Sequence, residues 1–337
     1  MSAPRPRRSV LYRLGTDPGS YAGARYLAVD ALLFDLEDSV SPADKAAARE
    51  RLVAAISKGG FAGQELLVRV NGLDTPWGQD DARAVAALPV DGVMLAKAED
   101  ADAMRALDKV LARAGAPASM GLWAMVETPR GVIAADAIAG SCRRMAGLAI
   151  GLGDLSRGMG GFRRAAPFRF PVLAALSAVL LAARAHGLAA IDSSFRDARD
   201  PAGFRAACLE SRELGYDGKA LSDPALAPIA DDAFSPTAEE QAWAARVAAG
   251  GRAGLLAPVE GAGDLRPGEV AAAVGRGLQQ RRERDGDGPL LPVLDVLLRH
   301  EGRARQRGVL VVHAIRDLEG LAGRRGMAEL LRCARPR

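Results

Sequence analysis

Eight short apolar runs recur between residues 9 and 223, separated by longer stretches with helical periodicity. Most of these runs are apolar nearly throughout, rather than alternating with polar residues. Parallel strands that are covered on both faces have this pattern. The runs therefore predict eight strands, at 9–14, 31–38, 65–71, 92–98, 121–128, 147–154, 189–195 and 219–223.

The stretches between the runs carry residues that begin and end helices. Ser41 is expected to be an N-cap, with Pro42 at the first helical position and Asp44 in the first turn. Gly187 and Gly215 stand where two later helices should end. Helices are predicted at 41–56, 77–88, 99–114, 130–139, 171–186 and 200–214.

Strands and helices in alternation imply right-handed parallel crossovers, and eight such units favour a closed barrel over an open sheet. The expected fold class is α/β, a (β/α)8 TIM barrel with a C-terminal extension. We expect the barrel, which is the catalytic domain, to cover residues 1–250. Residues 251–337 break the alternation and are expected to form an atypical, partly helical extension.

Composition narrows the class of protein. The chain is 49% hydrophobic and 26% charged, as is usual for a globular enzyme, and its net charge of +4 is spread rather than clustered. Aromatic residues make up 4%, so a nucleic-acid partner is not expected. Without a membrane-length apolar stretch, a signal-like apolar region or paired cysteines, the protein is expected to be cytoplasmic, with no membrane partner.

Polar residues stand at the carboxyl-terminal tips of nearly all the predicted strands. Active sites of barrels lie at that end, on the strand tips and the loops that follow them. Several of these residues could instead be N-caps of the following helices, a role that Asp often fills. The polar tip residues are Asp35, Glu37, Asp38, Arg69, Asn71, Lys97, Glu127, Asp154, Asp192 and Asp223.

Glu127 and Asp154 end the fifth and sixth predicted strands. Neighbouring strands lie about 4.8 Å apart, so the two carboxylates could share one cation. Two carboxylates completed by water and substrate oxygens suit Mg²⁺. The three histidines show no spacing typical of a zinc site. The alternative is that the two acids are unrelated surface residues.

Arg69 closes the third predicted strand, where its guanidinium could bind a substrate carboxylate through two hydrogen bonds. Its alternative role is a structural ion pair, for example with Glu37. The acids of the segment 35–38 are more numerous than one metal needs, so we expect Glu37 and Asp38 to orient Arg69 and metal-bound water. Lys97 could form a Schiff base, but pairing with an acid is favoured.

Taken in order, these segments resemble the citrate lyase beta-subunit-like family of the HpcH/HpaI aldolase superfamily. The longest matching segment is DALLFDLEDSVSPADKAAAR at 30–49, and the ordered set is much more specific than any one motif. The other matching segments are 8–15, 68–81, 92–100, 126–131, 151–155, 215–224 and 233–244.

The resemblance implies a barrel that binds Mg²⁺ through Glu127 and Asp154, with Arg69 as the carboxylate-binding residue and Glu37 and Asp38 as supporting acids. It implies cleavage or formation of a carbon–carbon bond in citryl-CoA, malyl-CoA or a similar 3-hydroxyacyl thioester. It also implies a homotrimer or homohexamer. A metal ion and a guanidinium can stabilise the negative charge that develops in such a reaction.

The chain departs from the family pattern at several positions. The usual Val-Pro-Gly of the first loop is replaced around Leu14 and Gly15, and Ala96 stands where a proline is usual. Residues 223–226 replace the usual His-Pro-Ser-Gln. Relatives often supply a catalytic Asp from the C-terminal region, for which Asp317 is the positional candidate. The pyruvate-aldolase branch is disfavoured, because it uses an early histidine and His186 is the first here.

Three hypotheses follow. The leading one is a Mg²⁺-dependent carbon–carbon lyase that acts on a small carboxylate or acyl-CoA substrate, such as citryl-CoA, malyl-CoA or a related 2-oxo acid. The second is an acyl-CoA thioester hydrolase that uses the same site. The third, prompted by the altered segment 223–226, is a non-catalytic barrel with a role in assembly or regulation.

Overall fold

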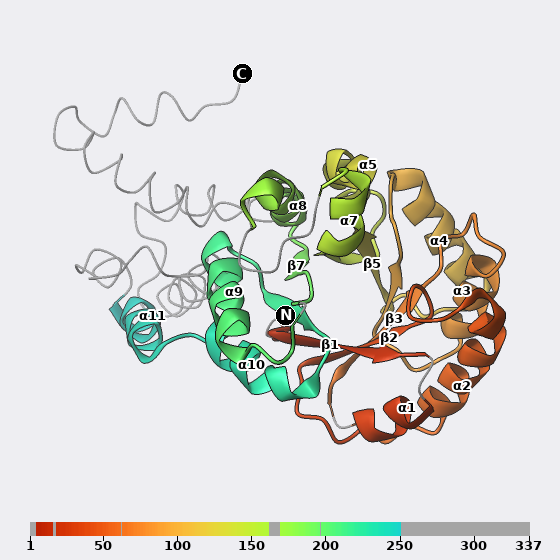
Figure 1. Ribbon diagram of the computed structural model, residues 1–337, viewed down its shortest axis with the longest axis horizontal. Helices are drawn as coiled ribbons and strands as arrows, with labels where there is room; N and C mark the ends of the chain where they lie inside the picture. The colour runs from red at the N-terminus through yellow and green to blue at the C-terminus, as the bar shows by residue number, and fades with distance from the viewer. Residues whose placement is uncertain (1–4, 16–17, 62, 162–168, 196, 251–337) are drawn as a thin grey trace, which may run out of the picture. The chain divides into compact units, whose positions relative to one another are not determined.

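The computed structural model describes residues 5–15, 18–61, 63–161, 169–195 and 197–250. Its strands form a closed parallel barrel in which each strand pairs with the next and β8 pairs with β1 (Figure 1). The predicted (β/α)8 fold is therefore confirmed. The strands are β1 (Ser9–Leu14), β2 (Ala31–Asp35), β3 (Glu65–Val70), β4 (Gly92–Leu95), β5 (Gly121–Val126), β6 (Met145–Ile150), β7 (Ala189–Asp192) and β8 (Gly218–Leu221).

Helices follow the strands and cover the outside of the barrel (Figure 1). The predicted helix at 130–139 is divided into two short helices, which meet at Ala134. The helices of this unit are α1 (Pro18–Ala24), α2 (Lys45–Ser57), α3 (Gly78–Ala86), α4 (Ala101–Arg113), α5 (Pro129–Ile133), α6 (Ala135–Ala139), α7 (Leu152–Gly158), α8 (Leu173–Ala185), α9 (Pro201–Leu214) and α10 (Ala227–Phe234).

The predicted helix ends are confirmed in part. Gly215 caps α9 with a left-handed φ of 106°, a conformation that glycine adopts without steric cost. Ser41 does occupy an N-cap position, with Pro42 first and Asp44 in the first turn, but it caps a 3-10 turn and makes no side-chain hydrogen bond to the backbone there. Its hydroxyl bonds Asp44 Oδ2 at 2.7 Å, and Pro42 begins a 3-10 turn (Pro42–Asp44) before α2. Ser41 is thus used within the turn rather than on the helix backbone.

Two apolar layers hold the barrel together. Side chains that point outward from the strands pack against the helices, and those that point inward fill the lumen. Trp123 is the largest lumen residue, and a Cβ at Gly147 on the neighbouring strand would lie 2.1 Å from its ring. Gly147 is therefore needed to make room for the indole.

The barrel unit ends at Ser235, and Pro236 begins a second unit, of which helix α11 (Ala238–Gly250) is described. Residues 251–337, where the extension is expected, lie outside the described residues. The domain limits at 250 and 251 therefore stay a prediction. None of the helices in the described ranges is long and apolar enough to cross a membrane.

Candidate active site at the carboxyl ends of the strands

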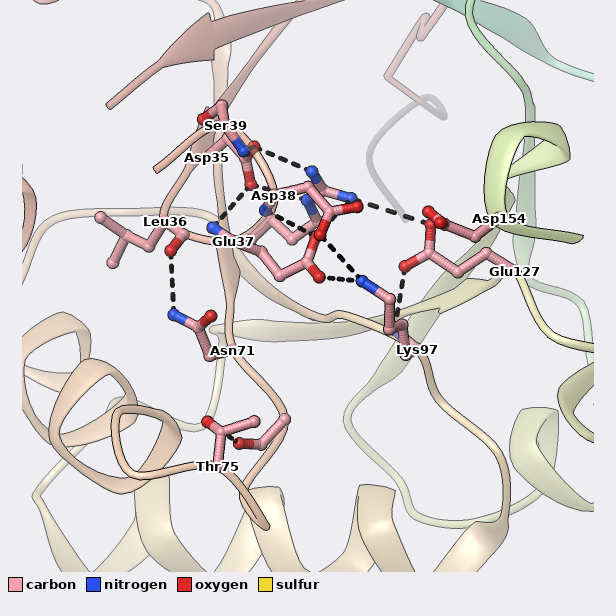
Figure 2. Close-up of polar contacts among 12 residues, drawn as sticks. Asp35, Leu36, Glu37, Asp38, Ser39, Asn71, Thr75, Lys97, Glu127 and Asp154 are labelled. Atoms are coloured by element: carbon pink, nitrogen blue, oxygen red, sulfur yellow. Dashed lines mark hydrogen bonds and ion pairs between the residues drawn. The ribbon is translucent and has the colours of Figure 1, made fainter. Parts of the chain in front are cut away.

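Polar side chains from successive strand ends meet at one edge of the barrel, and Figure 2 labels Asp35, Lys97, Glu127 and Asp154 among them. Asp35 is the last residue of β2 and Arg69 lies on β3, directly beside it in the strand register. Lys97 follows β4, Glu127 follows β5, and Asp154 follows β6. The strands end earlier than predicted, so several of these side chains come from the loops that follow them.

Asp35 holds the guanidinium of Arg69 in place. Arg69 Nε and Nη2 donate to the two carboxylate oxygens of Asp35 at 2.7 and 2.8 Å, and both side chains are buried. Burial opposes ionisation of Asp35, but the Arg69 charge and hydrogen bonds outweigh it and lower its pKa. The remaining nitrogen of Arg69, Nη1, lies 3.2 Å from Glu37 Oε2 and 3.8 Å from Glu127 Oε2. Arg69 is therefore fixed and charged, with Nη1 facing the acids of the site.

Lys97 connects the acids that follow β2 with Glu127, which follows β5 (Figure 2). Its Nζ donates to Glu37 and, at 3.0 Å, to Asp38, while its backbone N–H donates to Glu127 Oε1 at 3.0 Å. Burial lowers the pKa of Lys97, but these acids outweigh it and the pKa is raised. The pairing of Lys97 with an acid is confirmed. A charged amine is not a nucleophile, which disfavours the Schiff-base alternative.

Glu127 is buried, with 3% of its surface exposed. Burial raises the pKa of Glu127 to about 7, although Arg69 lowers it. Its Oε2 lies over the backbone that leads into α7, because a Cβ at Gly151 would be 2.5 Å from this oxygen. No described residue donates a hydrogen bond to Oε2. One oxygen of Glu127 is thus fixed by Lys97, and the other faces Arg69 Nη1 at 3.8 Å with room for a closer partner.

Asp154 lies in the first turn of α7 rather than at the end of a strand. It lines the same cavity as Arg69, and its carboxylate forms an ion pair with Arg157 (Figure 2 shows its place near Glu127). Gly151, which touches Glu127, is the N-cap of the same helix. The short β6–α7 connection therefore brings the two expected metal ligands to one region.

The donor set fits Mg²⁺. Within the described ranges, no group of three or more His, Cys, Asp or Glu side chains could hold a metal by itself. Glu127 Oε2 and the Asp154 carboxylate offer hard oxygen ligands, and Mg²⁺ commonly takes only one or two carboxylates with water and substrate as the rest. Whether these two residues bind the ion stays a prediction.

A buried polar network holds the loop after β2. Lys45 Nζ donates to the backbone oxygens of Leu36 and Glu37 and to Asn71 Oδ1, at 2.8 to 2.9 Å. Asn71 Nδ2 in turn donates to Leu36 O and to Asp81 (Figure 2 shows the contact with Leu36). Sequence reasoning gave Lys45 no role. The helical spacing of Lys45 from Ala48 and Leu52 could have indicated that it is buried, because the three residues share the buried face of α2.

A cavity of about 650 Å³ opens beside the charged side chains at the carboxyl ends of the strands. Asp35, Asp38, Arg69 and Asp154 line its polar side. Apolar residues of the lumen, among them Leu33, Met94, Met125 and Ile191, form its floor. A cavity of this size, with an apolar floor and a few convergent charges, is typical of a small-molecule site.

A match between this sequence and the model of a known protein family decides to which family the chain belongs. The model described as HpcH/HpaI aldolase/citrate lyase matches residues 8–224. The chain belongs to this family.

Relatives within the family carry two different activities in their names. The chain is 40% identical over 235 residues to a (3S)-malyl-CoA thioesterase of Cereibacter sphaeroides, which covers 70% of this chain and 79% of the relative. It is 33% identical over 292 residues to the citrate lyase subunit beta of Escherichia coli, covering 85% and 90%. The family thus contains enzymes of both kinds.

Solved structures of the family share the barrel. The CitE protein of Mycobacterium tuberculosis in complex with magnesium, acetoacetate and coenzyme A has 32% identity and a TM-score of 0.62, covering 74% of this chain and 88% of that one. The citrate lyase beta subunit of the same organism, complexed with oxaloacetate and magnesium, has 29% identity and a TM-score of 0.60, covering 68% and 98%. These neighbours were crystallised with magnesium, which is consistent with Mg²⁺ dependence in this family.

Two of the other polar strand tips, Asp223 and Asp192, already have partners within the protein, and Asp192 lines the same cavity as Arg69. Asp223 caps the 3-10 turn Pro224–Leu226 by accepting from Ala225 N at 2.8 Å, which confirms the N-cap alternative for this residue. Asp192 is buried and forms ion pairs with Lys219 and Arg169. Asp317, the positional candidate for a C-terminal catalytic acid, lies outside the described residues.

Proposed function

We propose that this protein is a Mg²⁺-dependent lyase that cleaves a carbon–carbon bond in a 3-hydroxyacyl-CoA such as malyl-CoA or citryl-CoA. One observation carries the proposal. A guanidinium that is fixed by a buried carboxylate faces Glu127, whose Oε2 accepts no hydrogen bond from the described residues, and Asp154 lines the cavity beside them. Charged groups placed before the reaction starts are the main source of catalysis in such sites.

In this proposal Glu127 and Asp154 hold the ion, and Arg69 binds the carboxylate of the substrate. When bound, Mg²⁺ would supply a Lewis acid for the substrate oxygens. Asp35 and Glu37 keep Arg69 oriented, and Lys97 keeps Glu37 and Glu127 in place. The floor of apolar lumen residues excludes water from the reacting carbons.

The bond changes are those of a retro-aldol cleavage. The 3-hydroxyl group loses its proton, the bond between C2 and C3 breaks, and C2 of the departing thioester takes up a proton. The products are a 2-oxo acid and a shorter acyl-CoA. Glu37 and Asp38 are the acids of this site that stand near the charged Lys97, and we propose that they move the proton from the hydroxyl.

A second candidate is hydrolysis of the thioester at the same site. It is supported by the 40% identity to the (3S)-malyl-CoA thioesterase of C. sphaeroides. In that reaction water attacks the thioester carbonyl, and coenzyme A leaves as a free thiol. The products separate the two candidates, since only hydrolysis releases thiol and only cleavage releases a 2-oxo acid.

We also propose that the ligands are small carboxylates and acyl-CoA thioesters, and that the chain assembles as a homotrimer or homohexamer. The assembly rests on family resemblance alone. Light scattering of the purified protein tests it. Nucleic acid and membranes are not proposed as partners.

The test of the function uses full-length protein with malyl-CoA and citryl-CoA, with and without Mg²⁺, assayed for 2-oxo acid and for free thiol. Glu127→Gln and Asp154→Asn should each lower Mg²⁺-dependent turnover by about a hundredfold or more. Asp102→Asn is the control, because Asp102 is an exposed helical acid outside the site. Unchanged turnover in either site variant would contradict the proposal, and a wild type inert with both substrates would favour a non-catalytic barrel.

A further inference from the structure

Tyr12 is a polar residue of the cavity wall that no role described above uses. It lies on β1 between Val10 and Leu14, and these three alternate residues all line the cavity. Its ring therefore points into the barrel lumen, where it packs against the apolar cluster that contains Leu33 and Met94. The apolar run SVLYRL hid this residue, because its pattern marks Tyr12 as a core position.

The ring of Tyr12 is held by the fixed guanidinium of the site. Arg69 Cζ lies 5.3 Å from the ring centroid, within the range of a cation–π contact. Because Arg69 is itself clamped by Asp35 through two hydrogen bonds, the phenol has a defined place beside the acids. Glu127, Asp35 and Glu37 are close enough for their charges to act on the Tyr12 hydroxyl.

The hydroxyl of Tyr12 has no hydrogen-bond partner in the part of the chain that the structure describes. None of the described residues donates a hydrogen bond to it or accepts one from it. The hydroxyl is also not one of the fully buried atoms that lack a partner, so it is accessible from the cavity. Burial raises the pKa of Tyr12 above its ordinary value, so the group stays a neutral O–H donor at physiological pH. A donor inside a cavity without an acceptor is costly unless a ligand or water supplies one.

We propose that Tyr12 is a further catalytic residue, whose hydroxyl donates a hydrogen bond to the thioester carbonyl oxygen of the substrate. The inference rests on the proposed function only in taking a thioester as the ligand. In carbon–carbon cleavage this oxygen becomes the enolate oxygen, and in hydrolysis it becomes the oxygen of the tetrahedral intermediate. Negative charge grows on it in both reactions, so a fixed neutral donor stabilises both transition states. No proton is transferred, and Tyr12 stays neutral.

Tyr12→Phe tests the inference, because it removes one oxygen and keeps the ring that packs on Arg69. Tyr26→Phe is the matched control, since Tyr26 is 87% exposed. We expect kcat of Tyr12→Phe to fall about tenfold to a hundredfold, with the affinity for Mg²⁺ alone and the melting temperature both unchanged. A merely structural role would instead lower the melting temperature and leave kcat near that of the wild type.

A binding measurement keeps the test independent of turnover. Calorimetry with Mg²⁺ compares acetyl-CoA with ethyl-CoA, the thioether that lacks the carbonyl oxygen. The wild type should prefer the thioester, and Tyr12→Phe should lose about fivefold of that preference. Equal preference in both proteins, or unchanged kcat in an active enzyme, overturns the inference and leaves the proposed function intact. If the preference is lost but no substrate is turned over, the proposed function fails and the Tyr12 contact stands; binding of neither ligand overturns both.

Discussion

Lys97 has a left-handed backbone with a φ of 49°, the only such non-glycine residue in the described ranges. Its two neighbours are fixed to adjacent strands, because Ala96 N donates to Val70 O at 3.2 Å and Ala98 N donates to Met125 O at 3.0 Å. The strained conformation turns the Lys97 N–H toward Glu127 while the side chain reaches Glu37. Strain of this kind persists only where the surroundings impose it.

The left-handed backbone of Lys97 leads to a prediction about the stability of two variants. Lys97→Gly and Lys97→Ala both lose the ammonium group, but only glycine tolerates a positive φ without cost. We therefore expect Lys97→Gly to have the higher free energy of unfolding, by about 1 kcal/mol. Urea unfolding of both variants measures the difference. The result would contradict the structure if the alanine variant were equally or more stable, as it usually is at ordinary backbone positions.

The Asp35–Arg69 pair gives the barrel a defined acid sensitivity. The pKa of Asp35 is lower in the folded protein than its ordinary value of 3.8, because Arg69 outweighs the burial. The contribution of the pair is therefore fully present above the ordinary pKa and is lost as the pH falls through the lower, folded-state pKa. Asp35→Asn should be less stable than the wild type at pH 7, with a difference that shrinks steadily below pH 4.

Urea unfolding followed by tryptophan fluorescence, between pH 7 and pH 3, measures this difference. Asp80→Asn is the control, since the Asp80 side chain is 58% exposed and its ion pairs are screened by solvent. A gap between wild type and Asp35→Asn that stays constant with pH would rule out a titrating Asp35 as its cause.

Single residues were predicted from the sequence where a charge interrupts an apolar run. Arg69 and Lys97 stand out in this way, and both occupy the predicted site. Tyr12 and Lys45 were missed for the opposite reason. Tyr12 fits its apolar strand and Lys45 fits its charged helix, so neither breaks the local pattern. Their roles depend on which face turns inward, and this is decided by packing.

At the scale of elements, the backbone of the β6–α7 connection packs closely against the Glu127 side chain, because a Cβ at Gly151 would lie 2.5 Å from Glu127 Oε2. Sequence reasoning placed Asp154 at a strand end, but β6 stops at Ile150 and the acid lies on the following helix. Gly151, in an extended conformation, is the N-cap of that helix. How soon the helix would start could not be predicted, because that depends on the Glu127 carboxylate lying against the backbone of Gly151.

Gly151→Ala should therefore weaken Mg²⁺ binding, although it replaces neither of the proposed ligands. Its Cβ would lie 2.5 Å from Glu127 Oε2 and 2.6 Å from Glu127 Cβ, so the carboxylate must move. A displaced ligand or supporting group typically costs about tenfold to a hundredfold in metal affinity. Calorimetric titration with Mg²⁺ measures the loss. Gly23→Ala is the matched control, because a Cβ there meets nothing within 4 Å. Equal Mg²⁺ affinity in the two variants would show that Gly151 does not shape the site.

At the scale of the whole molecule, the closed barrel was predictable because eight apolar runs in alternation leave few arrangements. The barrel then brings strand ends that are distant in the sequence to one edge. Asp35 and Glu127 are far apart along the chain, yet both lie next to Arg69. The sequence alone could place these residues at the same edge. It could not show that Arg69 is already paired with Asp35, because side-chain partners are chosen by distances that only the folded barrel defines.

This arrangement makes a prediction about coupling between ligands. In the proposed site, two protein carboxylates would leave most Mg²⁺ positions to water and substrate oxygens, and Arg69 would bind the substrate carboxylate. Mg²⁺ and oxaloacetate should therefore bind cooperatively, each raising the affinity for the other by the same factor, about tenfold or more. Thermal shifts with each ligand alone and with both together, supported by calorimetry in both orders, measure that factor. Asp154→Asn should abolish the coupling and Asp102→Asn should keep it. Strictly independent binding would mean that the two ligands do not meet at the edge where Glu127, Asp154 and Arg69 converge.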